Sequence, residues 1–398
     1  MDSAFFKNMF KGDRVLWSIY GVMLIISVIV MFSASSALAY KSGDYNAPAL
    51  RHMLFLGGAV IISTICARIN RKAILSLGYA FLSVAVVSLI YTSFMGGGVE
   101  ENNASRWLEI FGIRFQPSEL AKLGLVVVLS YFLSVWQTED GVPDRCLKWS
   151  FGITGLVCLA IFKENFSTAA ILFAVVFVLH FVGQARLKTL GKILGGIVAL
   201  VGLVLFLSYV AGKFDVEVPG LPRAETWVSR VSRHFDRIER KGSDSYVVTD
   251  DTRQIDYATM AIANSDGWGV GPGNSVMRDH IPYAYADFIY AVLVEEYGLL
   301  GGLIVLFLYL SFFYRSVMVA CNCGYMFGAL FCIGLSLMIL VQAFAHIMVC
   351  VGIFPVTGQP LPFISHGGTS ILMMSIYVGL IQNVASWEAK PAGEPAKA

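Results

Sequence analysis

The sequence has little charge. Only 14% of its 398 residues are Asp, Glu, Lys or Arg, whereas soluble domains carry about a quarter, so a water-soluble globular protein is disfavoured. Neither sign of charge dominates, because 29 basic residues stand against 27 acidic ones for a net charge of +2. A nucleic-acid binder would show a basic face or stripe, so we expect no nucleic-acid partner.

Cysteine chemistry is equally poorly represented. The seven cysteines are an odd number, and the long polar stretch 213–286 contains none of them. Cys321 and Cys323 are separated by one residue, so they match neither a C-x-x-C redox pair nor a zinc motif. The six histidines are scattered without metal-ligand spacing. We therefore expect buried, unreactive thiols and no dedicated metal site.

What the chain has in excess is apolar sequence. Hydrophobic residues make up 57% of it, with a mean hydropathy of +0.69. They gather in runs of about 20 residues, the length that carries a helix across about 30 Å of hydrocarbon. The first run, Val15–Leu38, ends near Ala37-Leu38-Ala39 as a signal peptide might, but it exceeds the apolar core of a signal, which is about 7–15 residues. The predicted fold is an all-α integral membrane protein with ten transmembrane helices, at 15–38, 49–67, 73–95, 118–136, 149–163, 166–183, 193–212, 287–314, 324–350 and 368–387.

The distribution of charge orients these spans. An even number of spans puts both termini on one side; the breaks on that side hold 14 Lys and Arg residues, and the short breaks opposite hold five. The positive-inside rule therefore places both termini in the cytoplasm. The expected organisation is a cytoplasmic segment 1–14, spans 1–7 within 15–212, a large external loop 213–286, spans 8–10 within 287–387, and a disordered Pro/Ala-rich cytoplasmic tail 388–398.

The external loop contains an amphipathic pattern. Trp227, Val231, Phe235 and Ile238 recur at helical spacing, and four arginines between 230 and 240 recur on an adjoining face. An apolar stripe beside a basic one suits a helix lying in the lipid headgroup layer. A helix packed on its own bundle would give the same pattern, and the sequence leaves both open.

Ionisable residues inside spans are costly and are functional candidates. Glu119 and Lys122 lie three apart near the outer end of the fourth span, on one helix face. They either neutralise each other as a structural pair or leave Lys122 to meet an anion in an externally open cavity. Arg106-Trp107, just upstream, adds a second cation with an aromatic neighbour, although interface anchoring would also explain it.

Glycines cluster before the eighth span. Gly267, Gly269, Gly271 and Gly273 end in Asn274-Ser275. No strand precedes this stretch and no P-loop lysine follows it, so it is not a nucleotide loop. We expect a tight turn that lets the backbone approach a ligand or a neighbouring helix.

Asp287 is the most informative carboxylate, because it stands where the polar loop enters the eighth span. It could simply be an N-cap or first-turn residue that complements the helix dipole. The same dipole favours the ionised form, and an ionised carboxylate at the membrane surface can serve as a general base. We expect Glu295 and Glu296, about two turns further on, to face the bundle interior or pair with polar neighbours.

The last outer loop is rich in proline. Pro355, Pro360 and Pro362 prevent regular helix, and Ser365-His366-Gly367-Gly368 opens the tenth span. Free backbone N–H groups at that helix start would seat an anion. Gln342 and His346 in the ninth span are predicted to be interhelical hydrogen-bonding residues rather than ligands.

Together these segments closely resemble the SEDS family of integral-membrane peptidoglycan glycosyltransferases (RodA/FtsW type), and the resemblance runs from the first span to the tenth. Five stretches carry it: Ser105–Trp107, Gln116–Lys122, Gly269–Ser275, Asp287–Gly298 and Leu361–Ser370.

The resemblance implies polymerisation of lipid II into β-1,4 glycan strands at the outer face of the cytoplasmic membrane. Asp287 matches the residue considered essential in that family and would take the proton of the acceptor sugar hydroxyl as undecaprenyl pyrophosphate leaves with inversion. The departing diphosphate needs cations or N–H donors. The candidate substrate-binding residues are Arg106, Trp107, Glu119, Lys122, Asn274, Ser275, Arg278, Ser365, His366, Gly367 and Gly368. A divalent cation, Mg or Mn, on the pyrophosphate stays open.

The chain departs from the family pattern in several places, among them one residue fewer between Val276 and Pro282, in the segment that holds Arg278. The family commonly has Leu-Pro-Glu-x-His-Thr before its Asp-Phe-Ile, whereas this chain reads Ile281-Pro282-Tyr283-Ala284-Tyr285-Ala286. Roles of that Glu, His and Thr therefore do not transfer. The usual Gln-Pro-Asp reads Lys163-Glu164-Asn165 here.

The resemblance also implies partners: a single-pass class B penicillin-binding protein, a transpeptidase, and other proteins of a division or elongation complex, besides membrane lipid. The compact length and Gly12-Asp13-Arg14 favour a division role. A flippase that moves lipid-linked precursors without bond chemistry is the alternative, because ten spans with buried charge fit transport too.

Overall fold

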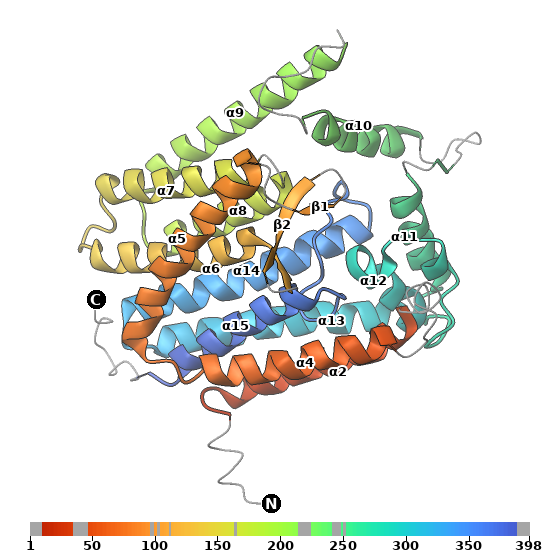
Figure 1. Ribbon diagram of the computed structural model, residues 1–398, viewed down its shortest axis with the longest axis horizontal. Coiled ribbons are helices and arrows are strands. Elements are labelled where there is room, and N and C mark those ends of the chain that lie inside the picture. Colours follow the sequence, from red (N-terminus) through yellow and green to blue (C-terminus); the bar gives the residue numbers. More distant parts are fainter. Residues whose placement is uncertain are drawn as a thin grey trace, which may run out of the picture. The chain divides into compact units, whose positions relative to one another are not determined.

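Apolar helices form where the sequence predicts membrane spans (Figure 1). The computed structural model describes residues 10–34, 47–95, 99–101, 104–110, 113–162, 165–213, 224–240, 248–249 and 252–387. In these residues nine helices are long and apolar enough to cross a bilayer: α2 (Arg14–Ala34), α4 (Ala47–Cys66), α5 (Arg71–Met95), α6 (Pro117–Val135), α7 (Asp144–Phe162), α9 (Leu187–Lys213), α13 (Ile289–Asn322), α14 (Met326–Cys350) and α15 (Gly368–Ala385). The remaining predicted span, the sixth at 166–183, corresponds to the shorter apolar helix α8 (Phe166–Val182). The predicted disordered tail 388–398 and the signal-like Ala37–Ala39 lie outside the described residues.

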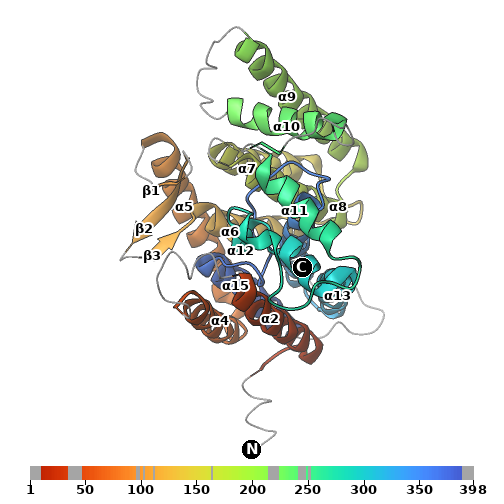
Figure 2. The same ribbon diagram turned by 90° about the vertical axis from the view of Figure 1, so that its right-hand side faces the viewer.

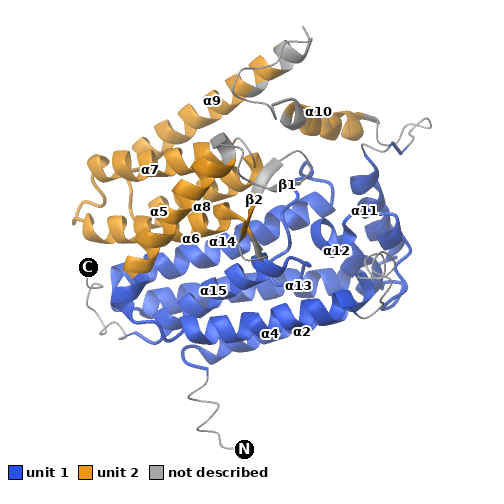
Figure 3. Ribbon diagram, in the orientation of Figure 1, with its two compact units in different colours: residues 1–74, 248–397 blue, residues 75–247, 398 orange. Residues whose placement is uncertain are grey.

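The chain forms two units, residues 1–74 with 248–397 and residues 75–247 with 398 (Figure 3). Unit 1 holds α2, α4, α13, α14 and α15, together with α11 (Arg253–Asn264), the 3-10 helix η1 (Met277–Asp279) and α12 (Ala284–Asp287). Unit 2 holds most of α5, the helices α6 to α9, α10 (Ala224–Arg240) and a small sheet. The predicted external loop 213–286 therefore contributes residues to both units.

In unit 1, helices from both ends of the chain pack side by side. α13 packs against α2 and α14, and α15 packs against α4 and α14 (Figures 1 and 2). A small residue lets α15 approach α4 closely, because a Cβ added at Gly379 would lie 2.4 Å from the Ser63 carbonyl oxygen. Such close approach at a small residue is how helices associate in lipid, where the hydrophobic effect does not drive them together.

Polar side chains join the helix ends where the chain begins, here named the Asp13 end. The Asp13 carboxylate accepts three hydrogen bonds from Arg315 of α13: one from Nη2 at 2.7 Å, and Nε donates to both carboxylate oxygens at 3.1 Å. Asp13 Oδ1 also caps the amide of Leu16. Burial raises the pKa of Asp13, but the hydrogen bonds and charge of Arg315 and the Leu16 amide outweigh it, so this pKa lies below its ordinary value. Gln382 of α15 exchanges two hydrogen bonds with the Asp13 backbone.

Asn383, the next residue of α15, makes a second set of hydrogen bonds at the Asp13 end. Asn383 Nδ2 donates to the carbonyls of Cys66 and Ile69 at 3.1 and 2.7 Å, and its Oδ1 accepts from Trp387. The turn after α4 is thereby held to the end of α15, with its carbonyls satisfied.

Unit 2 contains strands that the sequence analysis did not predict. β1 (Val99–Glu101), β2 (Ala104–Ile110) and β3 (Ile113–Phe115) form an antiparallel sheet in the order β1-β2-β3, directly before α6. Helices α7 and α8 pack together, and Asn165 Oδ1 caps α8 by accepting a hydrogen bond from the Thr168 amide. Asn caps a helix about as well as Asp, so this departure from the family pattern preserves the local structure.

The amphipathic pattern in the predicted external loop does form a helix, α10. Phe235 and Ile238 on its apolar stripe are 65% and 51% exposed, whereas Arg237 is buried. Exposed apolar side chains favour the headgroup-layer interpretation, although α10 also packs on α9 within unit 2.

Candidate active site

Asp287 is the last residue of α12 and lies just outside the eighth span. α13 begins at Ile289, and its N-cap is Phe288, whose φ of −134° and ψ of 22° separate the two helices. The alternative that Asp287 is simply the N-cap or a first-turn residue of this span is therefore wrong, because the N-cap is Phe288 and Asp287 lies one residue before it. The carboxylate still precedes the amino end of α13, where the helix dipole favours negative charge. Asp287 is partly exposed, whereas Phe288 beside it is fully buried.

The proline-rich loop between α14 and α15 is fixed by side chains that reach its carbonyls. Gln342 Nε2 donates to Pro360 O at 3.1 Å, and His346 Nδ1 donates to Gln359 O at 2.8 Å. Tyr309 of α13 and Ser27 of α2 donate to the carbonyls of the loop further on. The prediction that Gln342 and His346 are hydrogen-bonding residues is confirmed, with a loop rather than a helix as their partner.

The end of this loop is joined to the segment that carries Asp287. Ser365 Oγ donates to Ala286 O at 2.7 Å, and the His366 amide donates to Tyr285 O at 2.9 Å. Gly358 passes near the carboxylate, because a Cβ added there would lie 3.9 Å from Asp287 Oδ2. Gly367 is the N-cap of α15 and Gly368 its first residue, in agreement with the predicted start of the tenth span.

The glycine stretch packs on a break in α13. Gly298 has φ 71° and ψ −177°, which interrupts the helix. The amides of Val270 and Gly271 donate to the carbonyls of Glu295 and Glu296 at 2.9 and 3.0 Å, replacing donors that the break removes. A Cβ added at Gly269, φ +85°, would lie 2.4 Å from Glu296 O. Of the two expected uses of these glycines, the structure shows approach to a neighbouring helix.

Glu295 collects donors from the same segment. Its Oε1 accepts from Asn264 Nδ2 at 2.9 Å and from the amides of Val276 and Met277, and its Oε2 accepts from Ser275 Oγ. The side chain is fully buried, so these bonds offset the cost of removing a carboxylate from water. Asn274, in contrast, is exposed and bonds only to its own turn at Val270 O.

Glu296 pairs with Arg278. The end of unit 1 that contains Asp287, Glu296 and Arg278 is here named the Asp287 end. Ser33 of α2 donates to Glu296 Oε1 and accepts from Arg278 Nη1 at 2.6 Å, and Arg278 Nη1 lies 3.6 Å from Glu296 Oε1. The Glu296 side chain has no exposed surface, whereas that of Arg278 is 17% exposed. The expectation that both glutamates face the interior and pair with polar groups is confirmed. The sequence analysis did not identify Ser33.

In unit 2, the predicted pair of the fourth span is formed. Lys122 Nζ lies 2.6 Å from Glu119 Oε1, and Lys122 is 1% exposed. Glu119 lies in the first turn of α6, after Pro117 at N1. Trp107 is half-buried on β2, and Arg106 precedes it on that strand, with its side chain outside the described part of the structure.

No three His, Cys, Asp or Glu side chains gather as metal ligands among the described residues. The described cysteines are free thiols.

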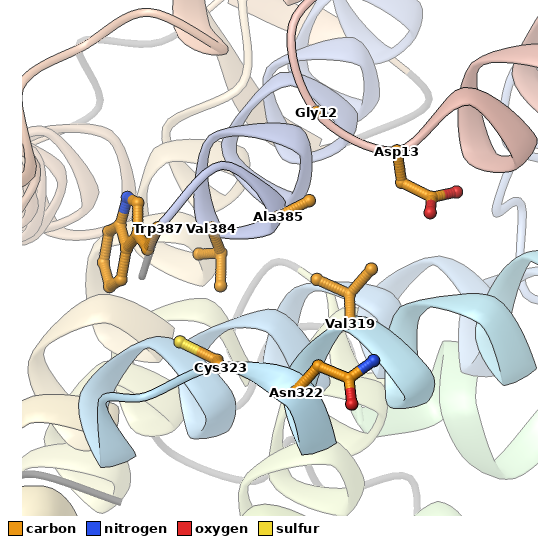
Figure 4. A pocket seen from close by; sticks show the side chains of 8 residues that line it. All are labelled: Gly12, Asp13, Val319, Asn322, Cys323, Val384, Ala385 and Trp387. Carbon is orange, nitrogen blue, oxygen red and sulfur yellow. The ribbon is translucent and has the colours of Figure 1, made fainter. Parts of the chain in front are cut away.

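A pocket of about 180 Å³ lies away from Asp287. It is bounded by the Gly12-Asp13 turn, the end of α13 and Trp387 (Figure 4). Residues 299–322 of α13 separate this end from the break at Gly298 by about 35 Å, at 1.5 Å per residue. The pocket therefore belongs to the Asp13 end and not to the candidate active site.

Comparison with known proteins places the chain. The family model described as "Cell cycle protein", of FtsW, RodA and SpoVE type, matches residues 13–390. A probable peptidoglycan glycosyltransferase FtsW from Nitrosococcus halophilus (strain Nc4) is 32% identical over 89% of this chain and 87% of the relative. One of the same name from Enterococcus hirae is 29% identical over 96% of this chain and 95% of the relative.

Two solved structures share the fold. The rod shape determining protein RodA of Thermus thermophilus superposes with a TM-score of 0.65 at 21% identity, covering 94% of this chain and 96% of that one. A chain of a peptidoglycan synthase complex that coordinates polymerization and crosslinking gives 0.69 at 22% identity, covering 94% and 97%. With its apolar helices and a family match over nearly its whole length, the chain belongs to the FtsW/RodA/SpoVE family of multi-pass cytoplasmic membrane proteins.

Proposed function

We propose that this chain is a peptidoglycan glycosyltransferase that polymerises lipid II, with Asp287 as its general base. The observation that carries the proposal is the partly exposed Asp287 carboxylate, which lies before the amino end of α13 and beneath Gly358 of a fixed loop. A base must be ionised to accept a proton, and the nearby helix start favours the ionised form.

In the proposed reaction, Asp287 accepts one proton. The acceptor hydroxyl loses its proton to the carboxylate while its oxygen attacks the anomeric carbon of the donor sugar. The bond from that carbon to the diphosphate breaks, and the diphosphate leaves with the electron pair. Attack from the opposite face inverts the carbon and gives the β-1,4 link. A rigid loop over the base keeps the reacting groups in position, which accounts for much of the rate in such transfers.

Groups for the leaving diphosphate lie on several elements. In unit 1, Arg278 is oriented by Glu296 and Ser33, and the Ser365–Gly368 segment opens α15 with backbone N–H groups. Asn274, Ser275 and His366 flank these elements. Lys122 with Glu119, and Arg106 with Trp107, lie in unit 2 and stay predictions of the sequence analysis. A divalent cation would serve as a charge carrier on the diphosphate, and no step here depends on it.

The names of the relatives also support a role in cell division and a partner protein. The relatives named FtsW favour a division role, and a solved relative belongs to a synthase complex that also crosslinks. We propose that a class B penicillin-binding protein is the partner, within a division complex. The charge bias of the short loops puts the Asp287 end outside and both termini inside. A fluorescent fusion that fails to gather at midcell would contradict the division role.

Purified protein, reconstituted with its partner transpeptidase and lipid II, tests the activity. The wild type should yield glycan polymer on a gel, and Asp287→Asn and Asp287→Ala should reduce the rate by about 10³-fold, within the range for loss of a general base. Both variants should fold normally, because the site is partly exposed. Wild-type protein that makes no polymer but moves fluorescent lipid II across a vesicle membrane would replace the enzyme with the flippase.

A further inference from the structure

A tyrosine in strained backbone stands one helical turn before Asp287. Tyr283 lies in the left-handed region, with φ 57° and ψ 32°, and it is the N-cap of α12, the short helix that ends with Asp287. Bulky side chains rarely adopt this backbone, because it crowds their Cβ atom. Such strain persists only where the surrounding structure or a function maintains it.

The buried aromatic Phe363 shows how packing can maintain the same strain. It lies in the loop between α14 and α15, has φ 66°, and is 1% exposed. Its ring packs edge-on against Tyr20 of α2, with the ring centroids 5.3 Å apart. Burial of a whole aromatic side chain therefore stabilises that part of the loop. Tyr283 lacks this explanation, because its side chain is 47% exposed.

The backbone of Tyr283 is fixed relative to Asp287. The Tyr283 carbonyl oxygen accepts hydrogen bonds from the amides of Ala286 and Asp287 at 2.9 and 3.0 Å. Four residues at 1.5 Å each separate Tyr283 from Asp287 by about 6 Å along the helix axis, which is comparable with the width of one sugar ring. An exposed aromatic residue is thus held one sugar ring away from the residue that carries the candidate base.

A second tyrosine extends the aromatic surface. The Tyr283 and Tyr285 rings pack edge to face with their centroids 6.3 Å apart, and the Tyr285 ring packs in the same way on His366 at 5.8 Å. The His366 amide donates to the Tyr285 carbonyl at 2.9 Å, which joins these rings to the loop before α15. Tyr285 is half-buried, so this row of rings is anchored at His366 and exposed at Tyr283.

The chemistry of an exposed aromatic ring selects its ligand. The face of the ring carries partial negative charge, so it does not attract a diphosphate. A pyranose presents C–H bonds of partial positive charge on an apolar face, which can lie flat on the ring while the sugar hydroxyls stay free. A tyrosine that only anchors a protein in the headgroup layer needs no special backbone. Tyr314 of α13, for example, is 66% exposed at an ordinary helical position.

We propose that Tyr283 and Tyr285 form a platform for the acceptor sugar, an inference that rests on the proposed glycosyl transfer. The sugar ring stacks on Tyr283, at the exposed end of the row, and its 4-hydroxyl points toward Asp287. The platform binds and orients the acceptor, and proton transfer stays with Asp287. Aromatic rings here stand where the usual family pattern, Glu-x-His-Thr, has polar side chains.

Separate titration of donor and acceptor tests the platform in the reconstituted complex with its partner transpeptidase. Lipid II with a methylated 4-hydroxyl on its terminal sugar can donate but not accept. With this labelled donor at saturation, the rate of labelled product against the concentration of ordinary lipid II gives the acceptor KM, and the reverse titration gives the donor KM. Tyr283→Ala should raise the acceptor KM about tenfold, roughly what one aromatic contact supplies, with the donor KM and kcat within about twofold.

Tyr283→Asn separates binding from stability. Asparagine tolerates left-handed backbone better than tyrosine, so this variant should raise the melting temperature and also raise the acceptor KM as Tyr283→Ala does. Tyr283→Phe keeps the ring and should restore the acceptor KM. A ring with only a structural role would give the opposite pattern in Tyr283→Asn, a lower melting temperature with an unchanged KM.

Tyr314→Ala is the matched control, because it removes an exposed tyrosine from a part of α13 beyond the break at Gly298. Neither KM should change in this variant. An acceptor KM of wild-type value in both Tyr283→Ala and Tyr283→Asn, or an equal rise in the donor KM, overturns the platform, while polymerisation by the wild type upholds the proposed function. A wild type that makes no polymer removes both.

Discussion

The two ends of unit 1 treat their polar groups differently. At the Asp13 end, the side chains of Asp13, Arg315, Gln382 and Asn383 are all hydrogen-bonded to partners on other segments. At the Asp287 end, buried polar atoms lack a hydrogen bond within the described residues: His52 Nδ1, Arg278 Nε, Glu296 Oε2, Tyr297 Oη, His346 Nε2 and His366 Nδ1. The named side chains of the Asp13 end are therefore hydrogen-bonded, whereas the Asp287 end has buried donors and acceptors that are not.

This difference in hydrogen bonding indicates that the Asp13 end serves mainly stability and the Asp287 end mainly activity. Satisfied polar networks rigidify a fold, whereas unsatisfied groups cost stability and persist where they serve another purpose. The same end also has a broken helix at Gly298 and a left-handed Tyr283, φ 57°. Strained backbone of this kind clusters at functional sites. We therefore expect substitutions at the Asp287 end to affect activity first, and those at the Asp13 end to affect stability alone.

Gly269→Ala should have the largest effect on the Asp287 end. The new Cβ would lie 2.4 Å from Glu296 O, a backbone atom, and Gly269 has φ +85°. Gly273→Ala is the control, because its φ of +80° is similar and nothing lies within 4 Å of the added Cβ. Unfolding in detergent should show a loss of about 1–2 kcal/mol for the control, the cost of left-handed backbone, and more than twice that for Gly269→Ala. Equal losses would mean that the close approach to α13 does not matter.

Glu296→Ala should come next, and it can divide stability from activity. Removing the carboxylate leaves the mostly buried Arg278 guanidinium with the exposed Asp279, 3.8 Å from its Nε, as its remaining counter-charge. Breaking a fully buried pair costs about 3–5 kcal/mol, and the 17% exposure of Arg278 together with the Asp279 charge reduces this to about 2 kcal/mol. Adding Arg278→Met should recover the stability without recovering polymerisation. If the double variant polymerised lipid II at the wild-type rate, Arg278 would have only a structural role.

Local sequence patterns account for the helices and for several polar pairs. Runs of about 20 apolar residues locate the spans, a three-residue spacing places Glu119 and Lys122 on one face, and prolines keep the loop between α14 and α15 irregular. Each of these signals is contained within one segment. The amphipathic α10 is of the same kind, since its periodicity is visible without knowledge of its neighbours.

The remaining features depend on contacts between segments far apart in the sequence. Gly298 resembles any glycine in an apolar span, and its break becomes evident only with Gly267–Gly271 packed against it. His52 is a lone histidine in an apolar run, a signal that marks a functional candidate, but its hydrogen-bond partner Ser27 lies on another helix. Asp287 was placed one position too close to its helix because Phe288 carries no capping signal. The sheet β1–β3 is short, and its strands lack the alternation that predicts one.

The smallest expected effect is at the Asp13 end, where pH provides the test. The pKa of Asp13 is lower in the fold than in the unfolded chain, so its ion pair contributes stability above the unfolded pKa, about 3.9, and loses it as pH falls through the folded value. Because the Arg315 side chain is 38% exposed, Asp13→Asn should cost about 1 kcal/mol at pH 7. Polymerisation per folded molecule should not change. Asp144→Asn in unit 2 is the control, since Asp144 lies 3.5 Å from Arg186 with both side chains about half exposed, and it should cost still less. The melting temperatures of wild type and Asp13→Asn should stay apart down to about pH 4 and converge as pH falls further, through the lower pKa of Asp13 in the fold. A gap that persisted below that pKa would assign the stabilisation to the hydrogen-bond geometry of the turn rather than to the charge of its carboxylate.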